Sequence, residues 1–476
     1  MDALTIDTAY GPVRGTARDG VRRFLGIPYA APVVGRARFE APRPPQPWTE
    51  PLDTTSFGPP ALQGPYPPPM DRLLPSSASL APDGNVLTVS VWTPDAADAL
   101  PVLVWIHGGA FVRGASCLDT YDGSPFARDG IVMVSVQYRL GAEGFAVLPG
   151  APTNRGLRDQ LCALKWVRDN IAAFGGDPSR VTIMGESAGS MSVLDLVASP
   201  AAEGLFSRAI AQSGGATAVS TQEDARRVSA ALAEHLGVEA TVDALAEVSP
   251  GDLLAAQDAV ALAVTLNPDP AVWGASVIRA GLGVMSWFPC LDDDLVPVVP
   301  LDAIGAGRAV PLRTVTTAEE FRLFAVPNGL AAAITVRTLP AVLGRFGFDT
   351  TTYAAYAAAR PGASPGDVVV AMLTDAAFTA PMLAVAGATT AAGRAAYVYE
   401  FGWRTSVADL GACHALELGF VFDTLPERPE YLVGEGAPQD LANRMHAAWV
   451  AFVRDGDPGW PAWLPGGQGR IQRFDG

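Results

Sequence analysis

A short stretch at residues 181–190 constrains the fold of this chain more than any other feature. It runs Val-Thr-Ile-Met into Gly-Glu-Ser-Ala-Gly, so an apolar strand enters a Gly-x-Ser-x-Gly turn, and a helix is predicted over residues 188–196. This order is typical of a nucleophile elbow, in which a strained turn lifts the hydroxyl of Ser187 above the end of a sheet. Gly185 and Gly189 leave the space that such a turn requires. Because Gly and Ser also abound in ordinary loops, the rest of the chain has to support this interpretation.

Strand-like and helix-like segments alternate along the remainder of the chain, which predicts an α/β architecture with a mostly parallel sheet. Residues 4–27 alternate loosely and are broken by Gly11-Pro12 and Asp19-Gly20, which predicts a short N-terminal antiparallel sheet. Apolar runs predict the further strands, and helical spacing or alanine-rich composition predicts the helices: strands at 86–92, 102–106, 131–136, 181–184, 209–211 and 397–401, and helices at 159–173, 223–265 and 353–395. We see no internal repeat and no domain boundary, so we expect a single domain over residues 1–476.

Composition excludes several classes of function. Hydrophobic residues make up 49% of the 476 residues and charged residues 17%, which predicts a large buried core. The net charge of −16 disfavours binding to nucleic-acid phosphates and to anionic membranes. The longest uncharged run, residues 376–393, is too short and too polar to span a bilayer. We therefore expect no nucleic-acid or membrane partner.

The four cysteines suggest free thiols rather than a metal site. Cys117, Cys162, Cys290 and Cys413 include no Cys-x-x-Cys pair and no metal-like spacing with histidine. The N-terminus has no basic segment followed by an apolar one, so no secretory signal is visible. These features predict a cytoplasmic protein without a metal or an organic cofactor.

A serine nucleophile needs a base, and four histidines are available. His235 and His446 lie in predicted helices, where a surface or structural role is favoured. His107 begins His-Gly-Gly-Ala after the strand at 102–106, where backbone N–H groups could face an oxyanion. An ordinary turn at the end of a strand could have the same sequence. His414 follows the strand at 397–401 in a loop and is the candidate base.

Together with the Ser187 motif, further short motifs resemble those of type-B carboxylesterases, the cholinesterase-like branch of the α/β-hydrolases, and most closely those of bacterial p-nitrobenzyl esterases. These motifs span essentially the whole chain: Phe24-Leu25-Gly26-Ile27-Pro28-Tyr29-Ala30, Tyr138-Arg139-Leu140-Gly141, Trp166-Val167, Asn170-Ile171, Phe174-Gly175-Gly176-Asp177-Pro178, Gly204-Leu205-Phe206, Gln212-Ser213-Gly214, the His414 segment and Gly456-Asp457-Pro458. The resemblance implies an α/β-hydrolase fold, with a central, mostly parallel mixed sheet flanked by helices. The cysteine pair that closes an early loop in many secreted relatives is replaced by Ala61 and Val86.

The resemblance also implies the remaining site residues. Relatives usually carry Asp-Glu where Glu319-Glu320 stand, which assigns the triad acid to Glu320, with Glu319 as the alternative. The oxyanion hole of the family is formed by backbone N–H groups that correspond here to Gly109, Ala110 and Ala188.

The expected function is that of a serine carboxylesterase that cleaves short-to-medium esters through an acyl-enzyme, as a monomer or homodimer. A carbamate or amide hydrolase with the same triad remains open, as does a non-catalytic binding protein, since this fold also serves in adhesion. Adhesion relatives typically lose the serine or the histidine, and this chain keeps both.

Overall fold

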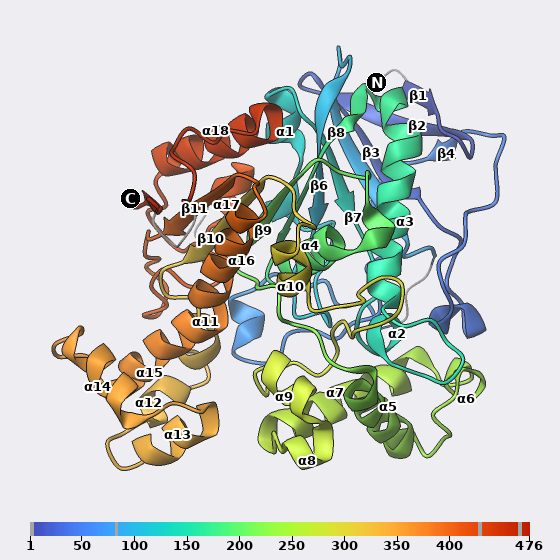
Figure 1. The fold of residues 1–476 in the computed structure, drawn as a ribbon. Coiled ribbons are helices and arrows are strands. Elements are labelled where there is room, and N and C mark those ends of the chain that lie inside the picture. Colours follow the sequence, from blue (N-terminus) through green and yellow to red (C-terminus); the bar gives the residue numbers. More distant parts are fainter. Residues whose placement is uncertain (1–3, 81–83, 427–430, 465–468) are drawn as a thin grey trace.

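A mixed β-sheet forms the centre of the molecule (Figure 1). The computed structural model describes residues 4–80, 84–426, 431–464 and 469–476. Within these residues twelve strands form one sheet in the order β1-β2-β3-β5-β7-β6-β8-β9-β10-β11-β12, with β4 beside β2. The strands are β1 (Leu4–Asp7), β2 (Pro12–Arg18), β3 (Val21–Pro28), β4 (Leu52–Asp53), β5 (Thr88–Pro94), β6 (Leu100–Ile106), β7 (Val132–Val136), β8 (Gly176–Glu186), β9 (Arg208–Gln212), β10 (Leu312–Thr317), β11 (Ala396–Phe401) and β12 (Gln472–Phe474).

Along the main order of the sheet, the pairing of neighbouring strands changes from antiparallel to parallel at β7. From β7 through β6 and on to β12 all neighbours are parallel, whereas β1, β2, β3, β5 and β7 pair antiparallel in succession. The predicted N-terminal antiparallel strands thus continue into the main sheet through the pairing of β3 with β5. The α/β prediction with a mostly parallel, mixed sheet is confirmed.

Helices cover both faces of this sheet and extend beyond its lower end (Figure 1). They are α1 (Ser124–Arg128), α2 (Gly141–Phe145), α3 (Arg155–Asn170), α4 (Ala188–Ala198), α5 (Gln222–Leu236), α6 (Val242–Ala246), α7 (Pro250–Leu266), α8 (Pro270–Trp273), α9 (Ala275–Ala280), α10 (Pro300–Gly305), α11 (Arg322–Ala325), α12 (Leu330–Ala333), α13 (Leu339–Phe346), α14 (Thr350–Ala358), α15 (Pro365–Thr374), α16 (Ala380–Ala391), α17 (Leu418–Phe422) and α18 (Gln439–Asp455). Figure 1 shows α5–α9 and α12–α15 as two groups below the sheet.

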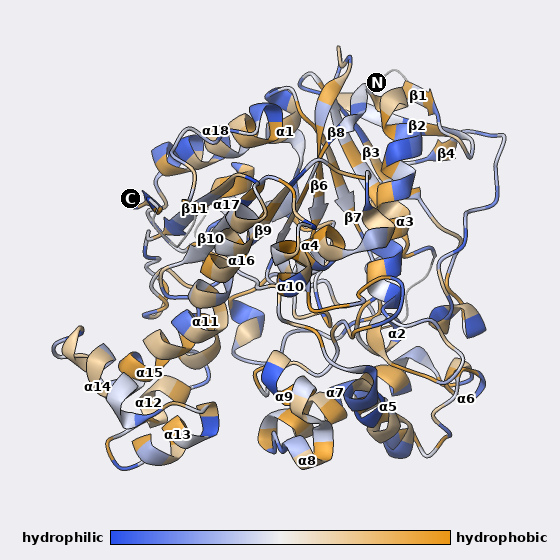
Figure 2. Cartoon of the chain, viewed as in Figure 1, coloured by the Kyte–Doolittle hydropathy of each residue, from blue (hydrophilic) through white to orange (hydrophobic). Residues whose placement is uncertain are grey.

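Alternate residues of β6 point into two different cores, because successive side chains of a strand face opposite sides. Val104 and Ile106 pack into one core with α3 and α4, whereas Leu103 and Trp105 pack into the other with α1, α17 and α18. Figure 2 shows hydrophilic and hydrophobic positions alternating along α3 and α18, as expected of helices with one buried face. Both faces of the central strands are therefore buried, and functional groups can be offered at the strand ends.

One helical run in the described part of the chain is long and apolar enough, by length and composition, to cross a membrane. It covers 27 residues, Pro365–Ala391, because a π-helix at Asp375–Thr379 joins α15 to α16. Half of its most apolar window is buried inside the molecule. Met382 and Val385 pack into the core beside the sheet, so the run serves as a core helix here.

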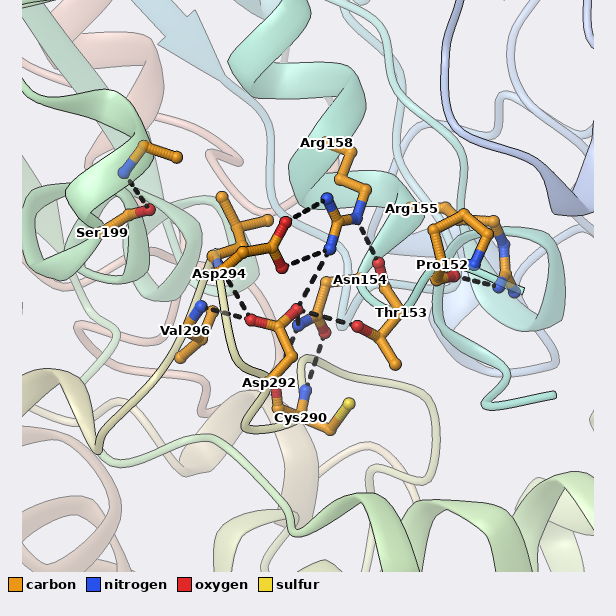
Figure 3. Close-up of polar contacts among 12 residues, drawn as sticks. Pro152, Thr153, Asn154, Arg155, Arg158, Ser199, Cys290, Asp292, Asp294 and Val296 are labelled. Carbon is orange, nitrogen blue, oxygen red and sulfur yellow. Dashed lines mark hydrogen bonds and ion pairs between the residues drawn. The ribbon is translucent and has the colours of Figure 1, made fainter. Parts of the chain in front are cut away.

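A polar cluster fastens the loop at residues 290–296 to the start of α3 (Figure 3). The buried carboxylate of Asp292 accepts hydrogen bonds from Asn154 Nδ2 (2.7 Å) and Thr153 Oγ1 (2.8 Å). Arg158 of α3 donates to both carboxylate oxygens of Asp294. These contacts hold the loop, which follows the buried Trp287 and Phe288, against the start of α3.

A fully buried ion pair anchors the segment that follows β7. Arg139 Nη2 lies 2.7 Å from Asp159 Oδ1, Arg139 Nε donates to Asp159 Oδ2 (2.8 Å), and neither side chain is exposed. Arg139 Nη1 also donates to the carbonyl groups of Arg38 and Glu40. One charge pair therefore joins three separate segments of the chain.

We expect Asp159→Ala to lower the free energy of unfolding by about 3–5 kcal/mol, because it leaves the Arg139 charge buried without its partner. Asp169→Ala on the same helix is the matched control. Asp169 pairs with Arg168 at 2.7 Å with both side chains half exposed, so its removal should cost less than about 1 kcal/mol. Urea unfolding followed by circular dichroism measures both, and equal losses would contradict the assignment.

Candidate active site

Ser187 occupies the sharp turn between β8 and α4. Its φ of 55° and ψ of −122° lie in a region that non-glycine residues rarely adopt. A Cβ on Gly185 would collide with the carbonyl of Gly189, and one on Gly189 would collide with the carbonyl of Ile106. The N–H of Ser187 donates to the carbonyl oxygen of Gln212 (2.8 Å). The geometry of the predicted elbow is thus held by close backbone packing.

The loop after β6 approaches this turn from the neighbouring strand. A Cβ on Gly108 would lie 3.1 Å from the Cβ of Ser187. Gly109 and Ala110 have φ values of 110° and 54°, and in the described part of the chain neither of their N–H groups donates to a protein acceptor. The same holds for the N–H of Ala188 at the start of α4. Three N–H groups near Ser187 are therefore available to an oxygen atom of a ligand.

The buried side chain of His107 supports this loop. Its ring is fully buried and stacks on Tyr138 with ring centroids 4.5 Å apart. The Tyr138 hydroxyl donates to the carbonyl oxygen of His107 (2.8 Å), and Nδ1 of His107 lies 2.9 Å from the Gly108 carbonyl. Burial lowers the pKa of His107 to about 4, so the ring is neutral at physiological pH.

His414 and Glu320 come together from the loops after the parallel neighbours β11 and β10. Nδ1 of His414 lies 2.6 Å from Oε2 of Glu320. The other carboxylate oxygen, Oε1, accepts hydrogen bonds from the Ser213 hydroxyl (2.6 Å) and the Thr317 N–H (2.7 Å). Glu320 is fully buried, and these partners compensate for the loss of hydration.

The structure brings Glu320, and not Glu319, to His414. The Glu319 carboxylate turns outward, where it is 23% exposed and lies 2.6 Å from Arg404 Nη1. The other two histidines lie elsewhere. His235 is exposed near the end of α5, and His446 on α18 is buried with Nδ1 2.8 Å from the Val421 carbonyl.

The far side of the His414 ring faces a second carboxylate. Nε2 of His414 lies 3.0 Å from Oε1 of Glu186, the residue before Ser187. Among the hydrogen bonds of the described residues none joins the Ser187 hydroxyl to His414. Burial alone lowers the pKa of His414, but the carboxylates of Glu186 and Glu320 outweigh it and raise the pKa to about 9. Burial raises the pKa of Glu186 to about 8, because the charged carboxylate loses its hydration.

A third buried acid, Glu417, lies three residues beyond His414. Its Oε1 accepts from Gln212 Nε2 (2.9 Å), and the side-chain oxygen Oε1 of Gln212 accepts from Trp449 Nε1 (3.1 Å). Burial raises the pKa of Glu417 to about 7. Sequence reasoning assigned no role to Glu186, Glu417 or Ser213. The only signal was their place inside the motifs around Ser187, His414 and Gly214.

Two aromatic rings also flank His414. The ring centroid of Phe378 lies 4.9 Å from that of His414, and that of Phe324 lies 5.2 Å away. Phe378 comes from the π-helix between α15 and α16, a feature often found at functional sites. Phe111 is fully buried and packs against Phe145, with ring centroids 4.9 Å apart.

Within the described ranges, no group of three or more His, Cys, Asp or Glu side chains is arranged to hold a metal ion, and the four cysteines are free.

We expect the imidazole of His414 to titrate well above its ordinary pKa of 6.5, and Glu186→Gln to lower that pKa because it removes a negative charge 3.0 Å from Nε2. NMR titration of histidine-labelled protein measures the shift, with His414→Ala identifying the resonance. Glu400→Gln, which changes a carboxylate paired with Arg473, is the control. A His414 pKa unchanged by Glu186→Gln would contradict the electrostatic assignment.

Comparison with known proteins identifies the family. The sequence profile described as the carboxylesterase family matches residues 2–468. The chain is 38% identical to para-nitrobenzyl esterase of Bacillus subtilis (strain 168), covering 97% of this chain and 93% of that protein. It is 34% identical to phenmedipham hydrolase of Pseudarthrobacter oxydans, covering 95% of this chain and 90% of that protein.

Solved structures agree with these sequence relationships. The structure of a thermophilic PNB esterase superimposes with a TM-score of 0.84 at 34% identity, covering 99% of this chain and 96% of the other. A second PNB esterase structure gives a TM-score of 0.79 at 35% identity over the same shares. The chain therefore belongs to the carboxylesterase family, has the α/β-hydrolase fold and hydrolyses carboxylic esters.

Proposed function

We propose that Ser187, His414 and Glu320 form a catalytic triad that cleaves esters through an acyl-enzyme. The observation that carries this proposal is the 2.6 Å contact between His414 Nδ1 and the buried Glu320 carboxylate, beside a serine in a strained elbow. Ser187 Oγ attacks the ester carbonyl while His414 Nε2 accepts its proton. His414 then protonates the leaving alcohol, and water releases the acid by the same steps.

The resting position of His414 gives Glu186 a part in this cycle. Because Nε2 faces Glu186 at 3.0 Å, the ring has to turn toward Ser187 Oγ before it can accept the proton. The protonated ring that forms keeps its Nδ1 contact with Glu320, and the Glu186 carboxylate remains a negative charge close to the ring. The pair of carboxylates thus favours the charged imidazolium of the transition state.

The oxyanion hole is proposed to consist of the N–H groups of Gly109, Ala110 and Ala188. Support comes from the left-handed conformations of Gly109 and Ala110 and from the lack of protein acceptors for all three groups in the described part of the chain. Gly108 permits the close approach of the loop to the elbow. Removing one such donor in a serine hydrolase costs about 10²–10³ in kcat.

We propose short-to-medium esters as substrates and a bacterial, cytoplasmic enzyme that acts as a single domain over residues 1–476, as a monomer or homodimer. Four free cysteines and a net charge of −16 support a reducing compartment and argue against nucleic-acid and membrane partners. The continuous sheet from β1 to β12 supports the single domain. The mechanism requires no metal or cofactor.

A second substrate class is worth testing, because one relative is a phenmedipham hydrolase at 34% identity. The rates on a series of p-nitrophenyl esters of increasing acyl length are compared with the rates on a p-nitroanilide and on phenmedipham. This comparison separates ester hydrolysis from hydrolysis of the anilide and of phenmedipham. We expect the highest kcat/KM on short and medium esters. A higher kcat/KM on phenmedipham or on the anilide would contradict the ester assignment.

Ser187→Ala and His414→Ala should each lower kcat on p-nitrophenyl acetate by about 10⁶, because the nucleophile and its base act as a unit. His235→Ala is the control, since His235 is exposed near the end of α5 and should retain wild-type turnover. Circular dichroism verifies that each variant is folded. A Ser187→Ala enzyme with a tenth of the wild-type rate would refute the assignment of the nucleophile.

Glu320→Gln should lower kcat by roughly 10⁴, since the amide no longer orients the imidazole or stabilises its charged form. Glu319→Gln serves as the comparison, and it should stay close to the wild-type rate because Glu319 does not contact His414. If Glu319→Gln proves the more damaging substitution, the triad acid has been assigned to the wrong residue.

Measurable hydrolysis of tert-butyl acetate is expected. The turn of Gly108, Gly109 and Ala110 has no side chain larger than a methyl group to place beside the scissile carbonyl, and Phe111, which follows it, packs against Phe145. The space beside the leaving oxygen should therefore admit a quaternary carbon. Gas chromatography of the released alcohol, with n-butyl acetate as the control substrate, measures this. Cleavage of the n-butyl ester alone would show that Phe324 or Phe378 fills the space.

A further inference from the structure

Two loops supply the groups that meet at His414. The loop after β10 carries Glu320, and the longer loop after β11 carries His414. Because β10 and β11 are parallel neighbours, both loops leave the same edge of the sheet. The contact between His414 Nδ1 and Glu320 Oε2 forms only if the longer loop is held in a fixed position relative to the shorter one.

Glu319 joins the two loops by a reciprocal pair of hydrogen bonds. Its N–H donates to the carbonyl oxygen of Ala412 (2.9 Å), and the Ala412 N–H donates to its carboxylate Oε2 (2.9 Å). Arg404, at the start of the longer loop, also donates to Oε2 (2.6 Å). Oε2 of Glu319 thus binds the longer loop at Arg404 and at Ala412, and Ala412 lies two residues before His414.

The backbone around Ala412 is shaped to receive this carboxylate. Gly411 has a φ of 64°, and a Cβ there would collide with Oε2 of Glu319. The carbonyl of Gly411 accepts from the Thr405 N–H (3.2 Å), which closes the loop on itself. Arg322, three residues beyond Glu319, donates from Nε to the Asp409 carbonyl (2.7 Å). Contacts from Glu319 and Arg322 therefore hold the longer loop just before His414. The triad itself holds this loop only through His414.

The other direct backbone link between the loops is weaker. The His414 N–H lies 3.4 Å from the carbonyl oxygen of Glu320, near the limit for a hydrogen bond. The Arg404 side chain is 62% exposed, so its charge adds little to the contact. Besides the contact between His414 and Glu320, the Glu319 carboxylate supplies the side-chain acceptor nearest to His414 along the longer loop, at the Ala412 N–H.

We propose that Glu319 is a positioning residue, which fastens the loop of His414 to the loop of Glu320 and so keeps the imidazole aligned with the triad acid. This inference rests on the triad proposed above. It assigns to Glu319 a role through backbone geometry and not through its charge. A glutamine at this position keeps the acceptor oxygen and should substitute for it, whereas an alanine should not.

The experiment compares Glu319→Ala and Glu319→Gln with Glu400→Ala. Glu400 is a matched control because it is also 23% exposed and pairs with one exposed arginine, Arg473, at 2.9 Å. For each variant kcat and KM on p-nitrophenyl butyrate, the melting temperature, and the downfield proton resonance of His414 Nδ1–H are measured. The resonance reports the contact with Glu320 whether or not the protein turns over this ester.

Glu319→Ala should lower kcat by about 10² with KM changed less than about threefold, because a small displacement of a catalytic group lowers kcat strongly. Its downfield resonance should broaden or vanish, while its melting temperature stays close to that of Glu400→Ala. Glu319→Gln should restore kcat to within about threefold of wild type and keep the resonance, since the amide oxygen still accepts from Ala412.

Two results would overturn the inference. One is a Glu319→Ala enzyme with wild-type kcat and an unchanged resonance. The other is a Glu319→Gln enzyme as impaired as Glu319→Ala, which would assign the effect to charge. Failure of the proposed triad itself looks different: the wild-type protein would then neither turn over the ester nor react at Ser187 with a fluorophosphonate probe.

Discussion

The close packing of α4 against the end of β6 is the constraint on which the site depends. Gly189 lies so near the carbonyl of Ile106 that no side chain fits between them, and this contact holds Ser187 at a φ of 55°. A strained residue persists only where its surroundings over-determine it, and here both faces of the central strands are buried. The large core thus stabilises a small turn that would be unfavourable in isolation.

The electrostatics around His414 follow from the burial of its ionisable neighbours. Glu186, Glu320 and Glu417 are all buried within the same region, yet only Glu320 has both carboxylate oxygens engaged by donors that favour its charge. Burial raises the pKa of Glu186 and of Glu417, so these two acids hold protons more readily than an exposed carboxyl does. The imidazole lies between Glu320 and Glu186, and a positive charge on it is favoured from both sides.

The surroundings of the site are drawn from distant parts of the chain. Phe378 reaches His414 from a π-helix inside an apolar run of 27 residues that could be mistaken for a membrane span. Ser213 follows β9 and binds the acid that follows β10. In the sequence, Phe378 and Ser213 look like ordinary members of core segments. Their roles depend on contacts between residues more than 30 positions apart, which local sequence patterns do not indicate.

The sequence by itself determined the α/β class, the elbow and the family, since these are written in short local patterns. Strand, tight turn and helix are contiguous around Ser187, and apolar periodicity marks the central strands. It named His414 by elimination among four histidines and left two candidates for the triad acid. Only the tertiary structure decided which carboxylate meets the ring: Glu320 points inward to Nδ1, whereas Glu319, one residue earlier, points outward to Arg404. Adjacent residues in a turn project in different directions, and that direction depends on the pairing of β10 with β11. For the same reason, the contacts of Glu186 and Ser213 could not be predicted from order along the chain.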